Sequence, residues 1–327
     1  MKSSTKVLLD SSAVLALCAA AGFPDAGNVS PLGAGEFNAV YAFEAAGRRY
    51  ALKIAPDSRA PVMTYERSMM QSEVFWYEQL RSHTAIAVPE ISHADFSRAL
   101  LPSDFFIMEL VPGKQMNEMD FTSAEKESAT EKLPEMAAQI HRIANRGYGY
   151  PQCGLHDTWP QALYAMVRAI VSDAAAMGKP CENGEKLLSL VQRHREVLSR
   201  AECRMVNFDL WEANILCDRR EDGMHYTWID PERGFWGDPL MDFICFEFDK
   251  PLFAKRASLS AYNAVAETPV VPGREAEIRF AFAQAYLGLI MEVERYYRYT
   301  PEDEGWKRND MVCGFLFEKA FGCLEGE

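Results

Sequence analysis

The chain has 327 residues, 48% of them hydrophobic and 25% charged, which is an ordinary globular composition and enough length for two domains. Its net charge of -13 argues against a nucleic-acid partner, because a phosphate backbone is bound by clustered Lys and Arg. No stretch approaches the ~20 apolar residues of a membrane span, so we expect no membrane partner.

The charge distribution and the cysteines give two weaker indications. Residues 1–113 contain 9 basic and 12 acidic side chains (net -3), and residues 114–327 contain 25 and 35 (net -10). An acidic C-terminal part would steer a cationic small molecule toward the protein, but it is also typical of a self-repelling, soluble surface. The eight cysteines form no C-x-x-C pair, which excludes a zinc ribbon or a thioredoxin-like site and favours a reducing cytoplasm.

The first 22 residues faintly resemble a signal peptide, with two lysines ahead of an apolar run. Asp10 interrupts this run, however, and Asp10-Ser11-Ser12 is typical of a helix N-cap. We therefore expect a helix from Ala13 to Ala21 that ends at Gly22, and a cytoplasmic rather than a secreted protein.

A β-hairpin with a glycine-rich start is expected next. Val40 to Phe43 and Tyr50 to Ile54 have a β-type composition, and Ala45-Ala46-Gly47 forms the turn between them. Gly33 and Gly35 precede the first strand and would let the backbone approach phosphates closely, although glycines also occur in plain hairpin turns.

Lys53 lies in the middle of the second strand, in an apolar run where an unpaired lysine is uncommon. The following helix, expected from Thr64 to Ser82, has a buried face that consists of Met69, Met70, Trp76, Tyr77 and Leu80. Glu73 falls on this face and needs a cationic partner, so we predict a Lys53–Glu73 ion pair. Glu66, two turns earlier on the same face, is the alternative partner.

The remainder of the chain divides into a short strand-rich part and a longer helical part. Val88 to Ile91 and Phe105 to Val111 are predicted strands, and Pro112-Gly113 ends the second, so we place a domain boundary at residue 113. The later segments are predicted helices at Ala124 to Arg146, Trp159 to Met177 and Gly184 to Ala201, strands at Arg204 to Phe208 and Tyr226 to Ile229, and helices from Pro239 onward.

The segment V-N-F-D-L-W-E-A-N-I-L contains an aspartate and an asparagine five residues apart, Asp209 and Asn214. Across a tight loop the carboxylate can take a proton from an attacking hydroxyl while the amide oxygen binds Mg²⁺. Asp230, at the end of the next predicted strand, would supply a second oxygen ligand for the metal. In the segment G-D-P-L-M-D, Asp238 is predicted to cap a helix, and Asp242, one turn later, to hold the Asp209 loop.

The order of these features resembles the aminoglycoside phosphotransferase and choline kinase-like superfamily of small-molecule kinases. The matching segments span residues 31 to 243 and include Asn38, in the superfamily's G-x-x-N-x-V-Y version of the glycine-rich loop. The resemblance implies an α+β, two-lobed protein-kinase-like fold. A small antiparallel-sheet N-lobe (1–113) would bind the nucleotide, and a larger, mostly helical C-lobe (114–327) would carry catalysis and acceptor binding.

The resemblance also implies ATP or GTP with Mg²⁺ as the phosphate donor and a role for each matched residue. Asp209 would be the catalytic base, Asn214 and Asp230 the metal ligands, and Lys53 the phosphate-binding lysine fixed by Glu73; the remaining nucleotide-binding positions would be Gly33, Gly35, Asn38 and the hinge residues Met108, Glu109 and Val111. The superfamily's usual His-Gly before the aspartate is replaced by Asn207-Phe208. Asn207 can still donate and accept hydrogen bonds, so we expect it to brace the metal-binding segment as the histidine does.

The expected function is transfer of the γ-phosphate of ATP or GTP to a hydroxyl of a small-molecule acceptor, with a cationic, aminoglycoside- or aminosugar-like acceptor favoured. Candidate carboxylates for this acceptor are Glu247, Asp249, Glu292 and Glu294. A choline- or ethanolamine-type alcohol is an alternative and would need an aromatic box, for which the chain offers Trp159, Trp236, Tyr296 and Tyr297. Another sugar or metabolite is a further alternative, and a nucleotide-binding pseudokinase without turnover is an alternative of another class.

Overall fold

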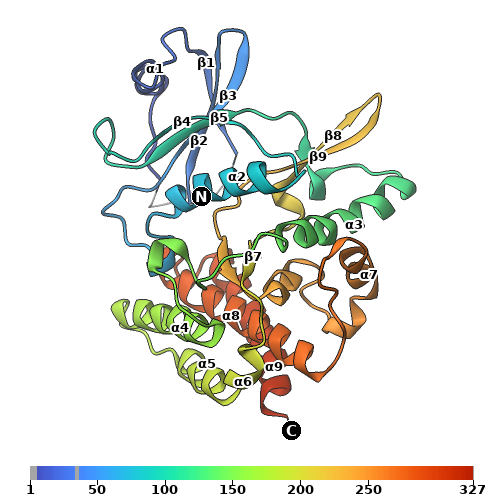
Figure 1. Ribbon diagram of the computed structural model, residues 1–327. Coiled ribbons are helices and arrows are strands. Elements are labelled where there is room, and N and C mark those ends of the chain that lie inside the picture. Colours follow the sequence, from blue (N-terminus) through green and yellow to red (C-terminus); the bar gives the residue numbers. More distant parts are fainter. Residues whose placement is uncertain (1–5, 34–36, 327) are drawn as a thin grey trace.

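The computed structural model describes residues 6–33 and 37–326 and has two lobes (Figure 1). The smaller lobe contains a five-stranded antiparallel sheet with the strand order β1-β2-β3-β5-β4. Its strands are β1 (Gly27–Leu32), β2 (Ala39–Ala45), β3 (Arg48–Ile54), β4 (Ile91–Asp95) and β5 (Phe105–Glu109). The larger lobe is mostly helical, which confirms the expected two-lobed α+β fold.

The predicted hairpin is β2 and β3, and its turn has the expected chemistry. Ala45 pairs with Arg48, so the connection has two residues, Ala46 at φ 49° and Gly47 at φ 71°. Positive φ at both positions gives the turn a twist that matches the twist of the strands. The register places Lys53 opposite Val40 on one side and Phe106 on the other, in the middle of the sheet.

The N-terminal helix α1 (Ser11–Ala20) is capped as predicted. The Asp10 carboxylate accepts a hydrogen bond from the Ala13 amide at 2.8 Å, and Gly22 follows the helix at φ 97°. The helix lies over one face of the sheet, and together they form a small separate core that includes Val14, Cys18, Tyr41, Phe43, Leu52 and Ile107. The sheet therefore has its own stabilising apolar contacts.

The helix predicted from Thr64 to Ser82 is wrong at its start. Thr64–Glu66 forms a single 3-10 turn, η1, and α2 (Met69–His83) begins only after Ser68, which has a left-handed φ of 56°. Contacts with distant elements hold η1 in place, because the Thr64 amide donates to Asp173 at 2.8 Å and Glu66 pairs with Arg298 at 2.5 Å. Glu66 therefore does not share a helix face with Glu73.

Helix α2 packs against both lobes. Trp76 and Leu80 belong to the core of the larger lobe, and the Trp76 and Trp236 ring centroids are 5.0 Å apart. Tyr77 instead contacts Phe106 of β5 in the sheet, at a centroid distance of 6.4 Å. Residue 113 remains our proposed domain boundary, with the qualification that α2 shares its core with the larger lobe.

The larger lobe is built around one long helix, α8 (Arg274–Arg298), in which every residue from Phe280 to Tyr286 is buried. A helix buried on all sides lies at the centre of a core. The other helices of this lobe are α3 (Ser123–Ile140), α4 (Trp159–Ala176), α5 (Glu182–Arg193), α6 (Arg195–Leu198), α7 (Arg256–Val265) and α9 (Glu304–Glu325). Several bounds differ from prediction: α3 ends at Ile140, and the helix predicted from Gly184 to Ala201 is divided at His194.

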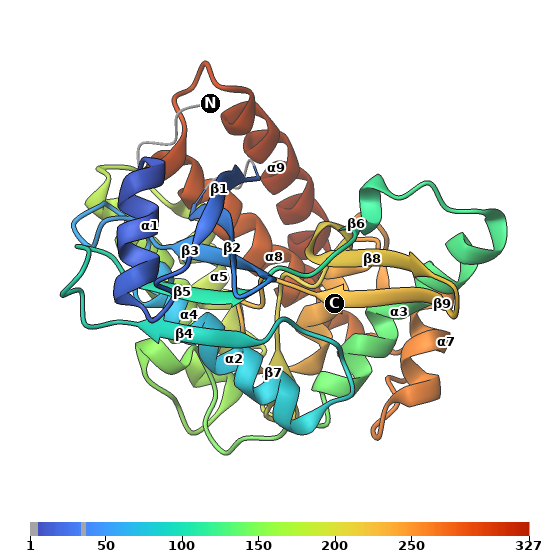
Figure 2. The same cartoon turned by 90° about the horizontal axis from the view of Figure 1, so that it is seen from above.

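The larger lobe also contains short strands between its helices. They are β6 (Lys114–Gln115), β7 (Arg204–Val206), β8 (Ile215–Arg220), β9 (Gly223–Trp228) and β10 (Phe235–Gly237). Strand β8 was not predicted, and β8 and β9 form a hairpin that projects beside α3 when seen from above (Figure 2). After β10, Pro239–Cys245 forms a 3-10 helix, η5, in place of the expected α-helix. Within the described residues, no helix has the length and apolar character to span a membrane.

Candidate active site

Lys53 is the centre of a buried ionic cluster. Its side chain projects from β3, is 4% exposed, and places Nζ 2.8 Å from Oε2 of Glu73 on α2. This confirms the predicted Lys53–Glu73 pair and excludes the alternative partner, Glu66. The same ammonium also contacts Asp230 Oδ1 and lies 3.3 Å from Glu232 Oε2.

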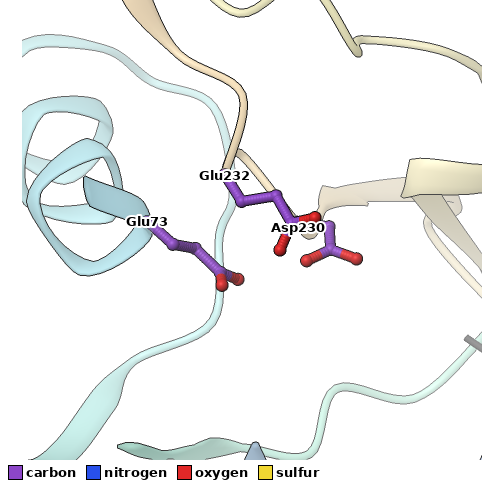
Figure 3. A group of neighbouring side chains, drawn as sticks. All are labelled: Glu73, Asp230 and Glu232. Atoms are coloured by element: carbon purple, nitrogen blue, oxygen red, sulfur yellow. The ribbon is translucent and has the colours of Figure 1, made fainter. Parts of the chain in front are cut away.

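The three carboxylates converge from two parts of the chain. Glu73 comes from α2, whereas Asp230 and Glu232 follow β9, and Figure 3 shows their carboxyl groups turned toward one another. The Asp230 amide donates to the Tyr77 hydroxyl at 2.9 Å, and a φ of 65° turns the chain sharply there. Sequence reasoning missed Glu232; its signal was a second carboxylate two residues after the strand-end aspartate.

The cluster is short of positive charge. Burial by itself would lower the pKa of Lys53, but Asp230, Glu73 and Glu232 outweigh it and raise that pKa well above its usual value. Burial also raises the pKa of Glu73 well above its usual value; Lys53 acts in the opposite direction, while Asp230 and Glu232 add to the rise. Oxygen atoms of Glu73, Asp230 and Glu232 lie within 4.8 Å of one another, and the other Glu73 oxygen, Oε1, is buried without a hydrogen-bond partner among the described residues. An oxygen-only donor set with a spare buried oxygen fits a hard divalent cation such as Mg²⁺.

The loop that carries Asp209 is held in place by the side chain of Asp242. The fully buried Asp242 carboxylate accepts hydrogen bonds from the Asn207 amide (3.1 Å) and the Phe208 amide (2.6 Å), and lies 3.0 Å from His141 Nε2. The predicted supporting position of Asp242 is therefore confirmed. His141, at the end of α3, was not predicted, and its only sequence signal was its place in the segment M-A-A-Q-I-H-R-I.

The two unusual residues before Asp209 have different surroundings. Phe208 has a left-handed φ of 61°, which costs a non-glycine residue on the order of 1 kcal/mol, and its ring is fixed between Phe235 and Tyr286. The Asn207 side-chain oxygen accepts a hydrogen bond from the Asp209 amide at 3.1 Å, while its buried Nδ2 has no partner among the described residues. Asn207 thus braces the Asp209 loop itself, and no hydrogen bond links it to the segment after β9 within the part of the chain described.

Asp209 and Asn214 face each other across the loop. Asn214 Nδ2 donates to the Asp209 carbonyl (2.9 Å) and to Asp209 Oδ2 (3.1 Å), which leaves the Asn214 amide oxygen for a metal ion. Arg233 Nε lies 4.0 Å from Asp209 Oδ2, and Glu294 holds this guanidinium through Nη2 at 3.2 Å. Removal from water raises the pKa of Asp209 to about 7, although Arg233 acts in the opposite direction.

The predicted glycine-rich segment and the end of β5 lie on the small-lobe side of the site. Gly33 has a φ of 66°, whereas Gly35 lies outside the described residues. Asn38 is 8% exposed and donates from Nδ2 to Glu232 Oε2 at 3.1 Å, so it reaches the carboxylate cluster. At the end of β5, the Glu109 amide donates to Glu90 and the Val111 amide has no hydrogen-bond partner among the described residues, which leaves it free for a bound base.

Asp238 has a structural position, as predicted. It is 1% exposed, its carboxylate accepts a hydrogen bond from the Leu240 amide at 3.0 Å, and Arg279 of α8 pairs with both of its oxygens at 2.7 and 2.6 Å. This pairing fixes the start of η5 and thereby the position of Asp242.

Of the carboxylates considered for the acceptor, Glu294 is linked to Asp209 through Arg233. It is sandwiched between Arg233 and Arg298, so its charge is largely compensated. Among the others, Glu292 accepts a hydrogen bond from Asn183, Glu247 pairs with Lys250, and Asp249 is exposed. The aromatic residues considered for a box are also used elsewhere: Trp159 and Trp236 are in the core, the Tyr297 hydroxyl donates to Asp173, and Tyr296 packs on Trp306.

Comparison with known proteins gives a consistent result. Residues 28–257 match the family model described as the phosphotransferase enzyme family. The fold is similar to that of a proposed aminoglycoside phosphotransferase from Ralstonia eutropha JMP134 (TM-score 0.62, 16% identity, 96% of this chain and 98% of that chain). It is also similar to a proposed fructosamine-3-kinase from Haemophilus somnus 129PT (TM-score 0.63, 16% identity, 89% and 91%). A third similar structure is a thermostable mutant of aminoglycoside phosphotransferase APH(4)-Ia in complex with AMP-PNP and hygromycin B (TM-score 0.61, 15% identity, 96% and 98%). Among curated protein sequences, none is significantly similar to this chain.

Proposed function

Because the chain belongs to the phosphotransferase enzyme family, we propose that it is a kinase that transfers the γ-phosphate of ATP or GTP to a hydroxyl of a small molecule. The observation that carries this proposal is the meeting of three charged groups from distant parts of the sequence. Lys53 contacts Asp230, and the neighbouring Ile229 amide donates to the carbonyl of Asn214, whose side chain contacts Asp209. Phosphoryl transfer needs these parts and little else: a phosphate-binding cation, metal ligands and a carboxylate for the attacking hydroxyl.

On the donor side, Lys53 would bind the nucleotide phosphates while Glu73 keeps its ammonium in position. Asp230 and Asn214 would hold Mg²⁺, which when bound would neutralise charge that develops on the phosphoryl oxygens. The backbone at Met108, Glu109 and Val111 would contact the base. We propose the same roles for these residues with either ATP or GTP as the donor.

On the acceptor side, Asp209 would receive the hydroxyl proton. Its Oδ2 is occupied by Asn214 and has Arg233 nearby, which leaves Oδ1 for the acceptor. A carboxyl group with a pKa of about 7 is ionised in a large fraction of molecules at neutral pH and is basic enough to draw off the proton.

We favour a cationic acceptor of the aminoglycoside or aminosugar type, supported by the net charge of -10 in residues 114–327 (25 basic, 35 acidic). A choline- or ethanolamine-type acceptor is less well supported, since Trp159 and Trp236 are in the core and cannot form an aromatic box. Another sugar or metabolite is the remaining alternative. We also propose a cytoplasmic location, supported by eight cysteines that are all unpaired.

The test is a donor-consumption screen of the purified protein with Mg²⁺ against aminoglycosides, aminosugars, neutral sugars, choline and ethanolamine. We expect consumption that depends on one acceptor class and is abolished in Asp209→Asn, while Mg-nucleotide binding in that variant stays close to wild type. Tight Mg-nucleotide binding with no transfer to any acceptor would instead identify a pseudokinase. Loss of nucleotide binding in Asp209→Asn would mean that Asp209 supports the fold or the metal and is not the base.

A further inference from the structure

The Lys53 ammonium uses all of its hydrogen-bond donors within the carboxylate cluster. A protonated lysine has three donors, and three carboxylates surround it: Glu73 Oε2 at 2.8 Å, Glu232 Oε2 at 3.3 Å, and Asp230 Oδ1 in direct contact. One oxygen of each of these three carboxylates also lies within 4.8 Å of the other two. The ammonium therefore stands in the space that a bound metal ion would share with these residues.

The cluster nevertheless carries a surplus of negative charge. One ammonium faces three carboxylates, of which Glu73 and Glu232 are 1% and 13% exposed at the side chain. The other polar contact of Glu232 comes from the neutral Asn38 amide, and two buried oxygens, Glu73 Oε1 and Asn38 Oδ1, have no hydrogen-bond partner among the described residues. Unpartnered buried oxygens beside carboxylates that one ammonium does not fully compensate indicate that a divalent cation suits this cluster better than the ammonium does.

An ammonium and a divalent cation cannot both occupy this cluster, because like charges a few ångströms apart in a buried site repel strongly. Glu73 cannot move aside, since α2 is packed against both lobes through Trp76 and Tyr77. Asp230 can, because 40% of its side chain is exposed. Lys53 must therefore find another anionic partner before Asp230 and Glu232 can turn to a metal ion.

We propose that Lys53 closes the metal site in the nucleotide-free protein, and that the nucleotide opens it by giving the ammonium phosphate oxygens to bind. This proposal rests on the proposed use of a metal–nucleotide donor. It adds that the metal ion binds weakly to the nucleotide-free protein and that its affinity rises strongly when the nucleotide is bound. Glu232 then belongs to the set of carboxylates that the nucleotide releases, together with Asp230.

The experiment measures Mn²⁺ binding to the full-length, nucleotide-free protein by the loss of the free-ion EPR signal. Mn²⁺ is a suitable probe because it takes oxygen ligands in the same octahedral arrangement as Mg²⁺. We compare wild type, Lys53→Met, Lys53→Met combined with Glu232→Gln, and Lys126→Met, an exposed control with the same change in net charge. We expect Lys53→Met to bind one Mn²⁺ about tenfold or more tightly than wild type and Lys126→Met, and Glu232→Gln to reverse most of that gain.

Tight Mn²⁺ binding by the nucleotide-free wild type, equal to that of Lys53→Met, would overturn the proposal whatever the variants do. Unchanged affinity in Lys53→Met would also overturn it if circular dichroism shows that the variant is folded, and Lys53→Gln provides a second test of the same point. A third arm adds ADP: the Mn²⁺ affinity of wild type should rise with nucleotide by at least about tenfold more than that of Lys53→Met. None of these readouts requires turnover, so a protein without kinase activity could still pass and an active kinase could still fail.

Discussion

Replacing Asp242 should weaken the support of the Asp209 loop without changing Asp209 itself. The Asp242 carboxylate is fully buried and is the acceptor for two buried amides, those of Asn207 and Phe208, besides its contact with His141. Each buried amide left without an acceptor costs about 1–3 kcal/mol, so Asp242→Ala should lower the free energy of unfolding by about 2–6 kcal/mol. Asp242→Asn keeps one oxygen and should lose about 2 kcal/mol.

Asp209 lies in the same loop, two residues after Asn207, so a displacement of the loop should also reduce kcat. A shift of the base by about 1 Å costs on the order of 10²-fold in rate, and we expect a loss of this size in Asp242→Asn with the acceptor that the screen identifies. Urea unfolding and initial rates measure the two effects. Asp104→Asn is the matched control: it also changes a buried carboxylate, one held by Arg98 and Gln71, and should cost stability without lowering kcat. An Asp242→Asn protein as stable and as active as wild type would refute this account of the loop.

Three further results are expected. The pH profile of kcat/KM should fall as pH drops through about 7, because Asp209 must be ionised to accept a proton and its pKa is raised to about 7; a rate that stays constant down to pH 5 would exclude it as the base. Gly234→Ala should lower the unfolding free energy by about 1–3 kcal/mol in a thermal melt, because the new Cβ would lie 2.4 Å from Trp76 Nε1. Arg279→Met should cost about 3–5 kcal/mol in urea unfolding, since it leaves the Asp238 carboxylate buried and unpaired; an unchanged midpoint would show that Asp238 needs no cation.

The parts of the site that could be predicted from the sequence are those in which a charged residue lies among apolar neighbours. A lysine inside an apolar strand and a glutamate on the apolar face of the next helix each need a partner, and each is the simplest solution for the other. The Asp10 cap, the Ala46-Gly47 turn and the Asp238 cap were predictable for a related reason, because turns and caps depend on a few adjacent residues.

The parts that could not be predicted depend on contacts between distant residues. Glu66 looked like a member of the Glu73 helix face, but Arg298 and the Thr64–Asp173 contact separate η1 from α2. Glu294 counted as an available carboxylate in the charge totals, although two arginines compensate it in the fold. Sums of charge do not reveal which charges are already paired.

The packing of α2 has a consequence for how the two lobes would move. Trp76 and Leu80 of α2 are part of the extensive large-lobe core, whereas α2 meets the sheet in a much smaller cluster of Met70, Val74, Tyr77 and Phe106, and the sheet has a further core with α1. We therefore expect α2 to behave as part of the large lobe's cooperative unit. If the lobes hinge apart, the sheet would carry Lys53 away while Glu73 stays in place, so the length of this one ion pair would report the degree of opening. Amide hydrogen exchange should then show α2 protected to the same level as α8, and the β2–β3 hairpin exchanging independently of both.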